Sequence, residues 1–115
     1  MAANPFDKAT NVFWVYAPYS TDPEIQTRRS TVRAEHLVNI ARLYDAKIIR
    51  GGGVLFEAEP KDKDSPMAVG TTMVVNLGSV AEVRKVLEED IYWTSKVWDN
   101  DKLLILPHLY FAAES

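Results

Sequence analysis

The sequence predicts an α+β domain of four strands and two helices in the order β-α-β-β-α-β. Four segments rich in β-branched and aromatic residues are separated by turn residues, as strands are. Two further segments are predicted helices. One repeats its apolar residues with a period of about 3.6 residues, and the other opens with a capping box. This order is typical of the ferredoxin-like arrangement, in which two helices cover one face of an antiparallel sheet.

Four segments of the chain are predicted strands. They cover residues 11–17, 47–58, 68–76 and 102–110. Pro18 stops the first strand, and the second contains three consecutive glycines, Gly51 to Gly53. A phosphate-binding loop would place a helix after such glycines, but the strand-like sequence VLFE follows them. The glycines therefore predict a bulge or kink that bends this strand.

Two helices connect these strands. The helices are predicted over residues 31–46 and 79–89, with a charged loop at 59–66 and a tryptophan-rich connection at 91–100. Ser79 and Glu82 form the capping box of the second helix. Upstream of the first helix, Asp22 is placed to cap an initial helical turn with Pro23 at its first position.

The composition limits the classes of protein to which this chain can belong. Its 115 residues are enough for one domain, and 47% hydrophobic with 25% charged residues excludes a disordered chain. The net charge of −3 provides no field that would attract nucleic acid or an anionic membrane surface. The chain has no apolar run near the roughly 18 residues of a membrane span and no signal peptide. With no cysteine, it fits a reducing compartment, and we expect a cytoplasmic protein.

One face of the first helix combines apolar and basic residues. Its apolar members, at helical spacing, are Leu37, Ile40, Leu43 and Tyr44. His36 and Arg33 fall on the same face, and Arg29 joins them if the helix runs that far back. Because an imidazole and a guanidinium are rarely buried without partners, this face predicts a polar pocket.

Both faces of the predicted sheet are apolar, although two helices can cover only one of them. The first strand places Trp14 and Tyr16 on one side and Phe13 and Val15 on the other, and residues 103–106 are all apolar. An exposed apolar face of this size needs a partner, and a second copy of the same sheet is the simplest one. We therefore expect a homodimer.

An ordered set of residues along nearly the whole chain resembles the YCII-related family of dimeric α/β-barrel proteins. The residues that carry the resemblance are Tyr16 to Pro18, Asp22, Arg29, Arg33 to Leu37, Gly51 to Gly53, Gly70, Thr71, Ser79, Glu82, Asp90 to Tyr92, Trp98, Asp99, Leu106 and Pro107. The resemblance implies a single YCII-like domain over residues 1–115 and an active site built on His36 and Asp90. It does not imply a substrate.

The chain departs from the family pattern at three positions. Ile91 follows the aspartate where the family often has proline, and Thr71 stands where serine is usual. The glycine that typically ends the first helix is absent, and Asp45-Ala46-Lys47 takes its place. A non-glycine residue in a left-handed helix cap costs about 1 kcal/mol, so this departure affects stability. None of the three removes the histidine–aspartate pair.

Each candidate site residue has a competing structural interpretation. His36 would otherwise be a core histidine bonded to a carboxylate or carbonyl, and Asp90 a turn former or solvated charge. Arg29 and Arg33 would otherwise pair with acidic neighbours such as Asp22, although the fork of Arg33 suits a carboxylate or phenolate.

The remaining candidates concern the substrate pocket and its contents. Tyr16 is either pocket or dimer interface, and Thr71 offers a hydroxyl. Only two histidines are present, and no acidic residues stand at ligand spacing, so we expect no metal and no cofactor. The three arginines around position 29 lack interleaved aromatics, which excludes a nucleic-acid surface.

Two functions follow from these residues. The first is a cofactor-independent lyase or isomerase that moves a proton on a phenolic, quinone-like or lactone metabolite. His36 would be the base, Asp90 its orienting partner and Arg33 the clamp for the oxyanion. The second is a non-catalytic metabolite-binding or accessory dimer. A hydrogen bond between His36 and Asp90 would favour the enzyme, whereas His36 bound only to a backbone carbonyl would favour the binding protein.

Overall fold

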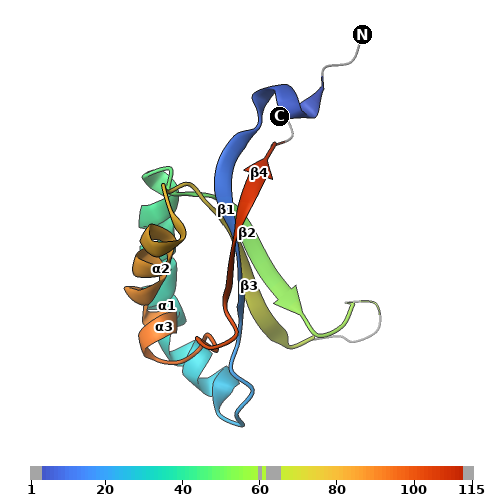
Figure 1. The fold of residues 1–115 in the computed structure, drawn as a ribbon. Helices are drawn as coiled ribbons and strands as arrows, with labels where there is room; N and C mark the ends of the chain where they lie inside the picture. Colours follow the sequence, from blue (N-terminus) through green and yellow to red (C-terminus); the bar gives the residue numbers. More distant parts are fainter. Residues whose placement is uncertain (1–3, 60, 62–65, 113–115) are drawn as a thin grey trace.

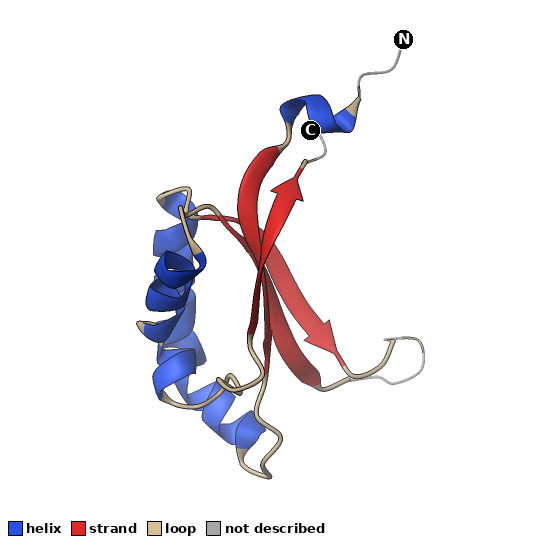
Figure 2. Ribbon diagram, in the orientation of Figure 1, coloured by secondary structure: helices blue, strands red, loops and turns tan. Residues whose placement is uncertain are grey.

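The computed structural model describes residues 4–59, 61 and 66–112, and in it one layer of helices lies against a four-stranded antiparallel sheet (Figure 1). The elements in chain order are η1 (Pro5–Lys8), β1 (Thr10–Pro18), α1 (Ile25–Asp45), β2 (Ile49–Phe56), β3 (Ala68–Val75), α2 (Val80–Glu88), α3 (Ile91–Thr94) and β4 (Leu104–Tyr110). The strand order is β2-β3-β1-β4. Helices α1, α2 and α3 all lie on one face of the sheet (Figure 2). The predicted α+β, ferredoxin-like fold is confirmed.

The hydrophobic core lies between the sheet and the helices. Alternation along β1 directs Val15 and Ala17 to the helices, and both are fully buried. The core also includes Val83 of α2, Tyr92 of α3 and Trp98, which follows α3. Burying an aliphatic or aromatic side chain of this size stabilises the fold by roughly 1.5–3 kcal/mol. The core therefore fixes the three helices to one side of the sheet.

Helix α1 begins at Ile25, six residues earlier than predicted. Upstream of α1, Asp22 caps an initial turn as predicted: its carboxylate accepts from the Glu24 amide at 3.1 Å, and it pairs with Arg28 through contacts of 3.0 and 2.7 Å. The hydrogen bond from Arg28 holds the pKa of Asp22 below its ordinary value. Arg28 also donates to the carbonyl of Lys96, which ties the start of α1 to the segment after α3. This early start places Arg29 on the helix.

The end of α1 is a Schellman motif built around a lysine. The Ile48 amide donates to the Leu43 carbonyl and the Lys47 amide to the Tyr44 carbonyl, at 3.0 Å each. Lys47 occupies the position at which glycine is usual and has a φ of 65°. The strained non-glycine cap predicted from the sequence is therefore present.

The three glycines of β2 lie at an irregular place in the sheet. The pairing of β2 with β3 shifts register between Ile49 and Gly51, and again between Leu55 and Phe56. The predicted bulge in this strand is confirmed. Downstream, Ser79 caps α2 by accepting from the Glu82 amide, as the capping box predicted.

The tryptophan-rich connection contains a helix that the sequence did not reveal. Asp90 is the N-cap of α3 and accepts from the Tyr92 amide at 2.8 Å. Ile91 takes the first helical position, at which proline is also favoured, so the departure from the family pattern preserves the turn. No helix in the described part of the chain is long and apolar enough to cross a membrane.

Replacing Lys47 by glycine should raise the free energy of unfolding by about 0.5–1 kcal/mol. Glycine removes left-handed strain of about 1–2 kcal/mol, and this gain exceeds the added entropy of the unfolded chain. Urea denaturation measures the change. The matched control is Lys85→Gly within α2, which should destabilise the protein by about 1 kcal/mol. A Lys47→Gly protein less stable than the wild type would contradict the strain assigned to this cap.

Candidate active site

The structure brings His36 and Asp90 together although 54 residues separate them. The Nδ1 atom of His36 lies 2.7 Å from Oδ1 of Asp90, and both side chains are buried. An ionised carboxylate can only accept hydrogen bonds, so this contact assigns the proton to Nδ1. In the neutral imidazole, Nε2 then carries the lone pair that a proton acceptor requires.

Three hydrogen bonds hold the carboxylate of Asp90 in place. Besides His36 and the Tyr92 amide, Asn39 of α1 donates its side-chain amide to Oδ2 at 2.8 Å. The carboxylate is 2% exposed, and burying an unpaired charge would cost several kcal/mol. Asp90 is thus both the cap of α3 and the partner of His36. This double role joins the two interpretations that the sequence left open.

Aromatic rings fix the plane of the imidazole. The ring of His36 stacks on Tyr92, with centroids 3.6 Å apart and an angle of 3° between the planes. Trp98 meets the imidazole edge-on at 5.8 Å. Burial raises the pKa of Tyr92, while the charges of Arg29 and Arg33 oppose this rise. Tyr92 is therefore a neutral phenol near pH 7.

His36 lines a cavity of about 270 Å³ between α1, β2 and β3. One end of the cavity is polar, with Arg29, Arg33 and Thr71, and Gly51 to Gly53 line it from β2. The other end is apolar and is lined by Leu37, Ile40 and Tyr44 of α1. The predicted polar pocket is therefore present.

The apolar face of α1 is not packed as the helical pattern predicted. Leu43 is buried in the core, but Leu37 is 43% and Tyr44 is 56% exposed. The prediction of a continuous buried stripe was wrong, because these two side chains form the wall of an open cavity and do not pack against the sheet. A wall of this kind leaves apolar surface free for a ligand.

Arg29 and Arg33 have no carboxylate partner within the described residues. The acidic neighbour Asp22 pairs with Arg28 instead. The guanidinium of Arg29 lies over the ring of Tyr19, 5.2 Å from its centroid, and its Nε atom is buried without a hydrogen bond. Two cations without acidic partners at one end of a cavity favour an anionic ligand.

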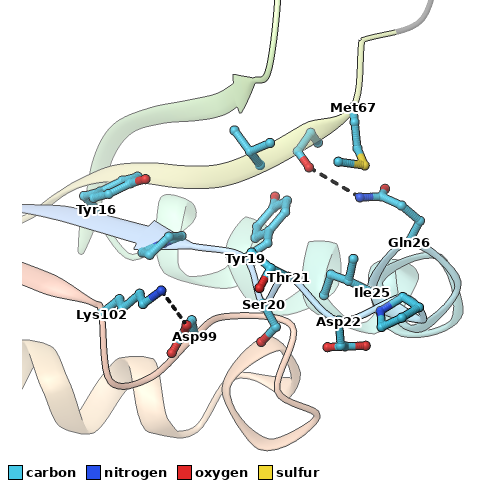
Figure 3. A pocket seen from close by; sticks show the side chains of 14 residues that line it. Tyr16, Tyr19, Ser20, Thr21, Asp22, Ile25, Gln26, Met67, Asp99 and Lys102 are labelled. Carbon is cyan, nitrogen blue, oxygen red and sulfur yellow. Dashed lines mark hydrogen bonds and ion pairs between the residues drawn. The ribbon is translucent and has the colours of Figure 1, made fainter.

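Tyr16 does not line this cavity. It lies on the helix-free face of the sheet, stacked on Trp14 with centroids 6.3 Å apart, so the structure does not bring it together with His36. Alternation along β1 sends residues 13, 15 and 17 to the helices and residue 16 away from them. Tyr16 instead lines a second hollow of about 620 Å³, shown in Figure 3.

The charged groups of this second hollow already have partners. Lys102 lies 3.8 Å from Asp99, and Gln26 donates to the Ala68 carbonyl (Figure 3). Asp22 is engaged by Arg28. Among the described residues that line this hollow, no carboxylate or ammonium is left unpaired for a ligand, so the cavity beside His36 is the better candidate site.

Two tyrosines of the site were missed by the sequence analysis. Tyr19 and Tyr92 both line the cavity beside His36. The alternation that places Val15 and Ala17 on the helix side also places Tyr19 there, so its position was predictable. No comparable signal identified Tyr92, because its place depends on α3. Thr71, which was predicted, bonds to Tyr19 at 3.1 Å and accepts from Trp98 at 3.3 Å.

The residues that the structure describes contain no group of three histidine, aspartate or glutamate side chains able to hold a metal ion.

No protein-family model matches this chain, and no curated protein matches it. Among solved structures, the chain is similar to 5-chloro-2-hydroxyhydroquinone dehydrochlorinase from Burkholderia phenoliruptrix AC1100, in complex with 2,5-dihydroxybenzoquinone. The TM-score is 0.64 at 20% sequence identity, over 89% of this chain and 95% of the other. This similarity supports the ferredoxin-like α+β fold of the chain.

Replacing Gly52 by alanine should destabilise the protein by about 1–3 kcal/mol, in the range of overpacked sites. A Cβ atom there would lie 2.4 Å from the Thr72 carbonyl oxygen and 3.2 Å from the Met73 Cα, so β2 and β3 would have to separate. The matched control is Gly53→Ala, whose Cβ would meet nothing closer than Thr72 Oγ1 at 4.0 Å. Thermal melting compares the two variants, and equal losses would contradict the assignment.

Proposed function

We propose that the protein is a cofactor-independent enzyme of the YCII-related family that transfers a proton on a small metabolite, as a lyase or an isomerase. The observation that carries this proposal is the 2.7 Å contact between Nδ1 of His36 and Asp90, which leaves Nε2 free to act as a base. His36 also lines a cavity that supplies space for a substrate. A histidine bonded only to a backbone carbonyl would have favoured a binding protein.

The proposed mechanism assigns one role to each group. His36 accepts a proton from an acidic C–H or O–H of the substrate through Nε2. Asp90 holds the ring and stabilises the imidazolium that forms. Arg33, with Arg29 beside it, binds the oxygen on which negative charge develops. The imidazolium then returns the proton to another atom in an isomerisation, or the electron pair expels a leaving group in an elimination.

The size and lining of the cavity support a small acidic substrate. Its volume of about 270 Å³ lies near the lower end of ligand pockets, which favours a small ligand. Its apolar end suits a ring and its cationic end suits a phenolate, enolate or carboxylate. The similar structure acts on a chlorinated hydroxyhydroquinone and holds 2,5-dihydroxybenzoquinone. We therefore place hydroxylated quinones and phenols ahead of lactones as substrates.

The proposal includes a homodimer in the cytoplasm. The helix-free face of the sheet carries Trp14, Tyr16, Leu55, Leu104 and Leu106, and the three leucines are 39–48% exposed. Two such faces packed together would remove this apolar surface from water and give the dimeric α/β barrel of the family.

His36→Ala should lower turnover by about 10²- to 10⁴-fold, because it removes the general base. Substrates would be found by screening hydroxybenzoquinones, hydroquinones and lactones for thermal stabilisation, and then assayed by steady-state kinetics. Arg33→Lys should mainly raise KM, since a point charge replaces a bidentate fork.

The matched control for this test is His108→Ala, which removes the other histidine, outside the cavity. It should leave turnover near the wild-type value. Melting curves test whether His36→Ala remains folded. Full activity in His36→Ala, or a loss explained by unfolding alone, would contradict the proton-transfer mechanism. A non-catalytic metabolite-binding or accessory dimer would then be the better description.

Leu104→Asp should abolish the dimer and leave an aggregating or unfolded chain, because it places a charge in the proposed sheet-to-sheet contact. The control is Val38→Asp on α1, where valine is 72% exposed and outside that contact. Analytical sedimentation at micromolar concentration measures the mass of both variants and of the wild type in solution. A wild-type species with the 13.0 kDa mass of one chain would contradict the dimer.

A further inference from the structure

A chain of hydrogen bonds runs through the core and ends at the cavity. Trp98 donates its indole N–H to Thr71 Oγ1 at 3.3 Å, and Thr71 Oγ1 lies 3.1 Å from the hydroxyl of Tyr19. Trp98 is fully buried, and Tyr19 and Thr71 are buried while lining the cavity beside His36. Figure 3 shows the ring of Tyr19 directed toward β3, the strand that carries Thr71.

These three side chains carry three polar protons but make only two hydrogen bonds with one another. An indole N–H can only donate, so it occupies one lone pair of the Thr71 hydroxyl. The Tyr19–Thr71 contact consumes one of the two hydroxyl protons, whichever residue donates it. Within the described residues, the other proton has no hydrogen-bond acceptor among the contacts of these two groups. One O–H donor is therefore left for a molecule in the cavity.

Tyr19 is better suited than Thr71 to supply that donor. A phenol is a stronger hydrogen-bond donor than an aliphatic alcohol, so an anion in the cavity favours the arrangement in which Thr71 donates to Tyr19. The guanidinium of Arg29, 5.2 Å from the ring centroid, draws electron density from the phenol. The backbone also holds Tyr19 firmly, because its amide donates to the Val69 carbonyl at 2.9 Å.

We propose that Tyr19 is a second catalytic residue, which donates a hydrogen bond to the substrate oxygen that becomes negative when His36 removes a proton. This inference rests on the proposed function and names a group within the same site. Thr71 and Trp98 are positioning residues that direct the Tyr19 proton toward the cavity. Tyr19 does not transfer its proton, and the charge stays on the substrate oxygen between Tyr19 and the arginines.

The test uses para-nitrophenol, a phenol whose anion has a visible absorption distinct from that of its neutral form. Titration of the probe against wild-type protein and Tyr19→Phe gives the affinity for each form. Tyr19→Phe should bind the phenolate about 10- to 100-fold more weakly, the range for a hydrogen bond to a charged group. Binding of the neutral phenol should change little, so the apparent pKa of the bound probe should rise by one unit or more.

Three further variants make the outcome specific. Tyr110→Phe, outside the cavity, is the matched control and should bind the probe as the wild type does. Thr71→Val should weaken phenolate binding less than Tyr19→Phe, since the phenol O–H remains. A larger loss in Thr71→Val would assign the donor to Thr71 and overturn the proposal. A loss in Tyr92→Phe with none in Tyr19→Phe would overturn it as well.

The probe also separates this inference from the proposed reaction. If nitrophenolate binding depends on Tyr19 but turnover does not depend on His36, the result supports Tyr19 as the hydrogen-bond donor. The same result contradicts His36 as the base. If the bound probe has the same apparent pKa in Tyr19→Phe as in the wild type, while turnover still depends on His36, Tyr19 is not the hydrogen-bond donor. The role of His36 as the base would then stand. A wild-type protein that does not bind the phenolate would contradict an oxyanion site at Tyr19.

Discussion

The buried carboxylate of Asp90 connects the parts of the molecule on which the site depends. It lies beneath the helical layer at 2% exposure and receives hydrogen bonds from His36 and Asn39 of α1 and from the Tyr92 amide of α3. A buried charge is tolerated only when its hydrogen bonds are made, so α1 and α3 must keep their relative position. The same three contacts set the tautomer of His36 and place Tyr92 against its ring. The geometry of the catalytic candidate is therefore coupled to the packing of two helices.

The cavity exists because α1 is anchored away from β2. At its start, Arg28 ties the helix to Asp22 and to the Lys96 carbonyl, and in its middle Asp90 ties it to α3. On the other side, Gly52, which shares the helix-facing register of Met73 and Val15, offers no side chain to fill the space between the helix and the sheet. A Cβ atom at Gly52 would clash with the backbone of β3, so the close approach of β2 and β3 requires glycine at this position. The same residues that bend the strand leave room for a ligand.

The features that the sequence predicted correctly depend on local patterns, and those that it missed depend on tertiary contacts. Alternation and helical period located the strands, the helix face with His36 and the fold class. The start of α1 was misplaced because it depends on the contact of Arg28 with Lys96, 68 residues away. Tyr16 was chosen for its hydroxyl, whereas the alternation of β1 favours Tyr19 on the helix side. The role of Asp90 came from the family resemblance, and only the fold shows that it is buried.

The charges around the cavity suit the two charges that the proposed reaction would create. Arg29 and Arg33 line the same cavity as His36 and favour a negative oxygen on the substrate. The carboxylate of Asp90 contacts the ring at Nδ1, on the side away from the atom that would accept the proton. When a proton moves to Nε2, the imidazolium is balanced by Asp90 and the substrate anion by the arginines. Each new charge thus forms against a counter-charge already in place, and the site needs little rearrangement during the reaction. This separation of two charge pairs, one held by α3 and the other by the first turns of α1, suits proton abstraction better than ligand storage.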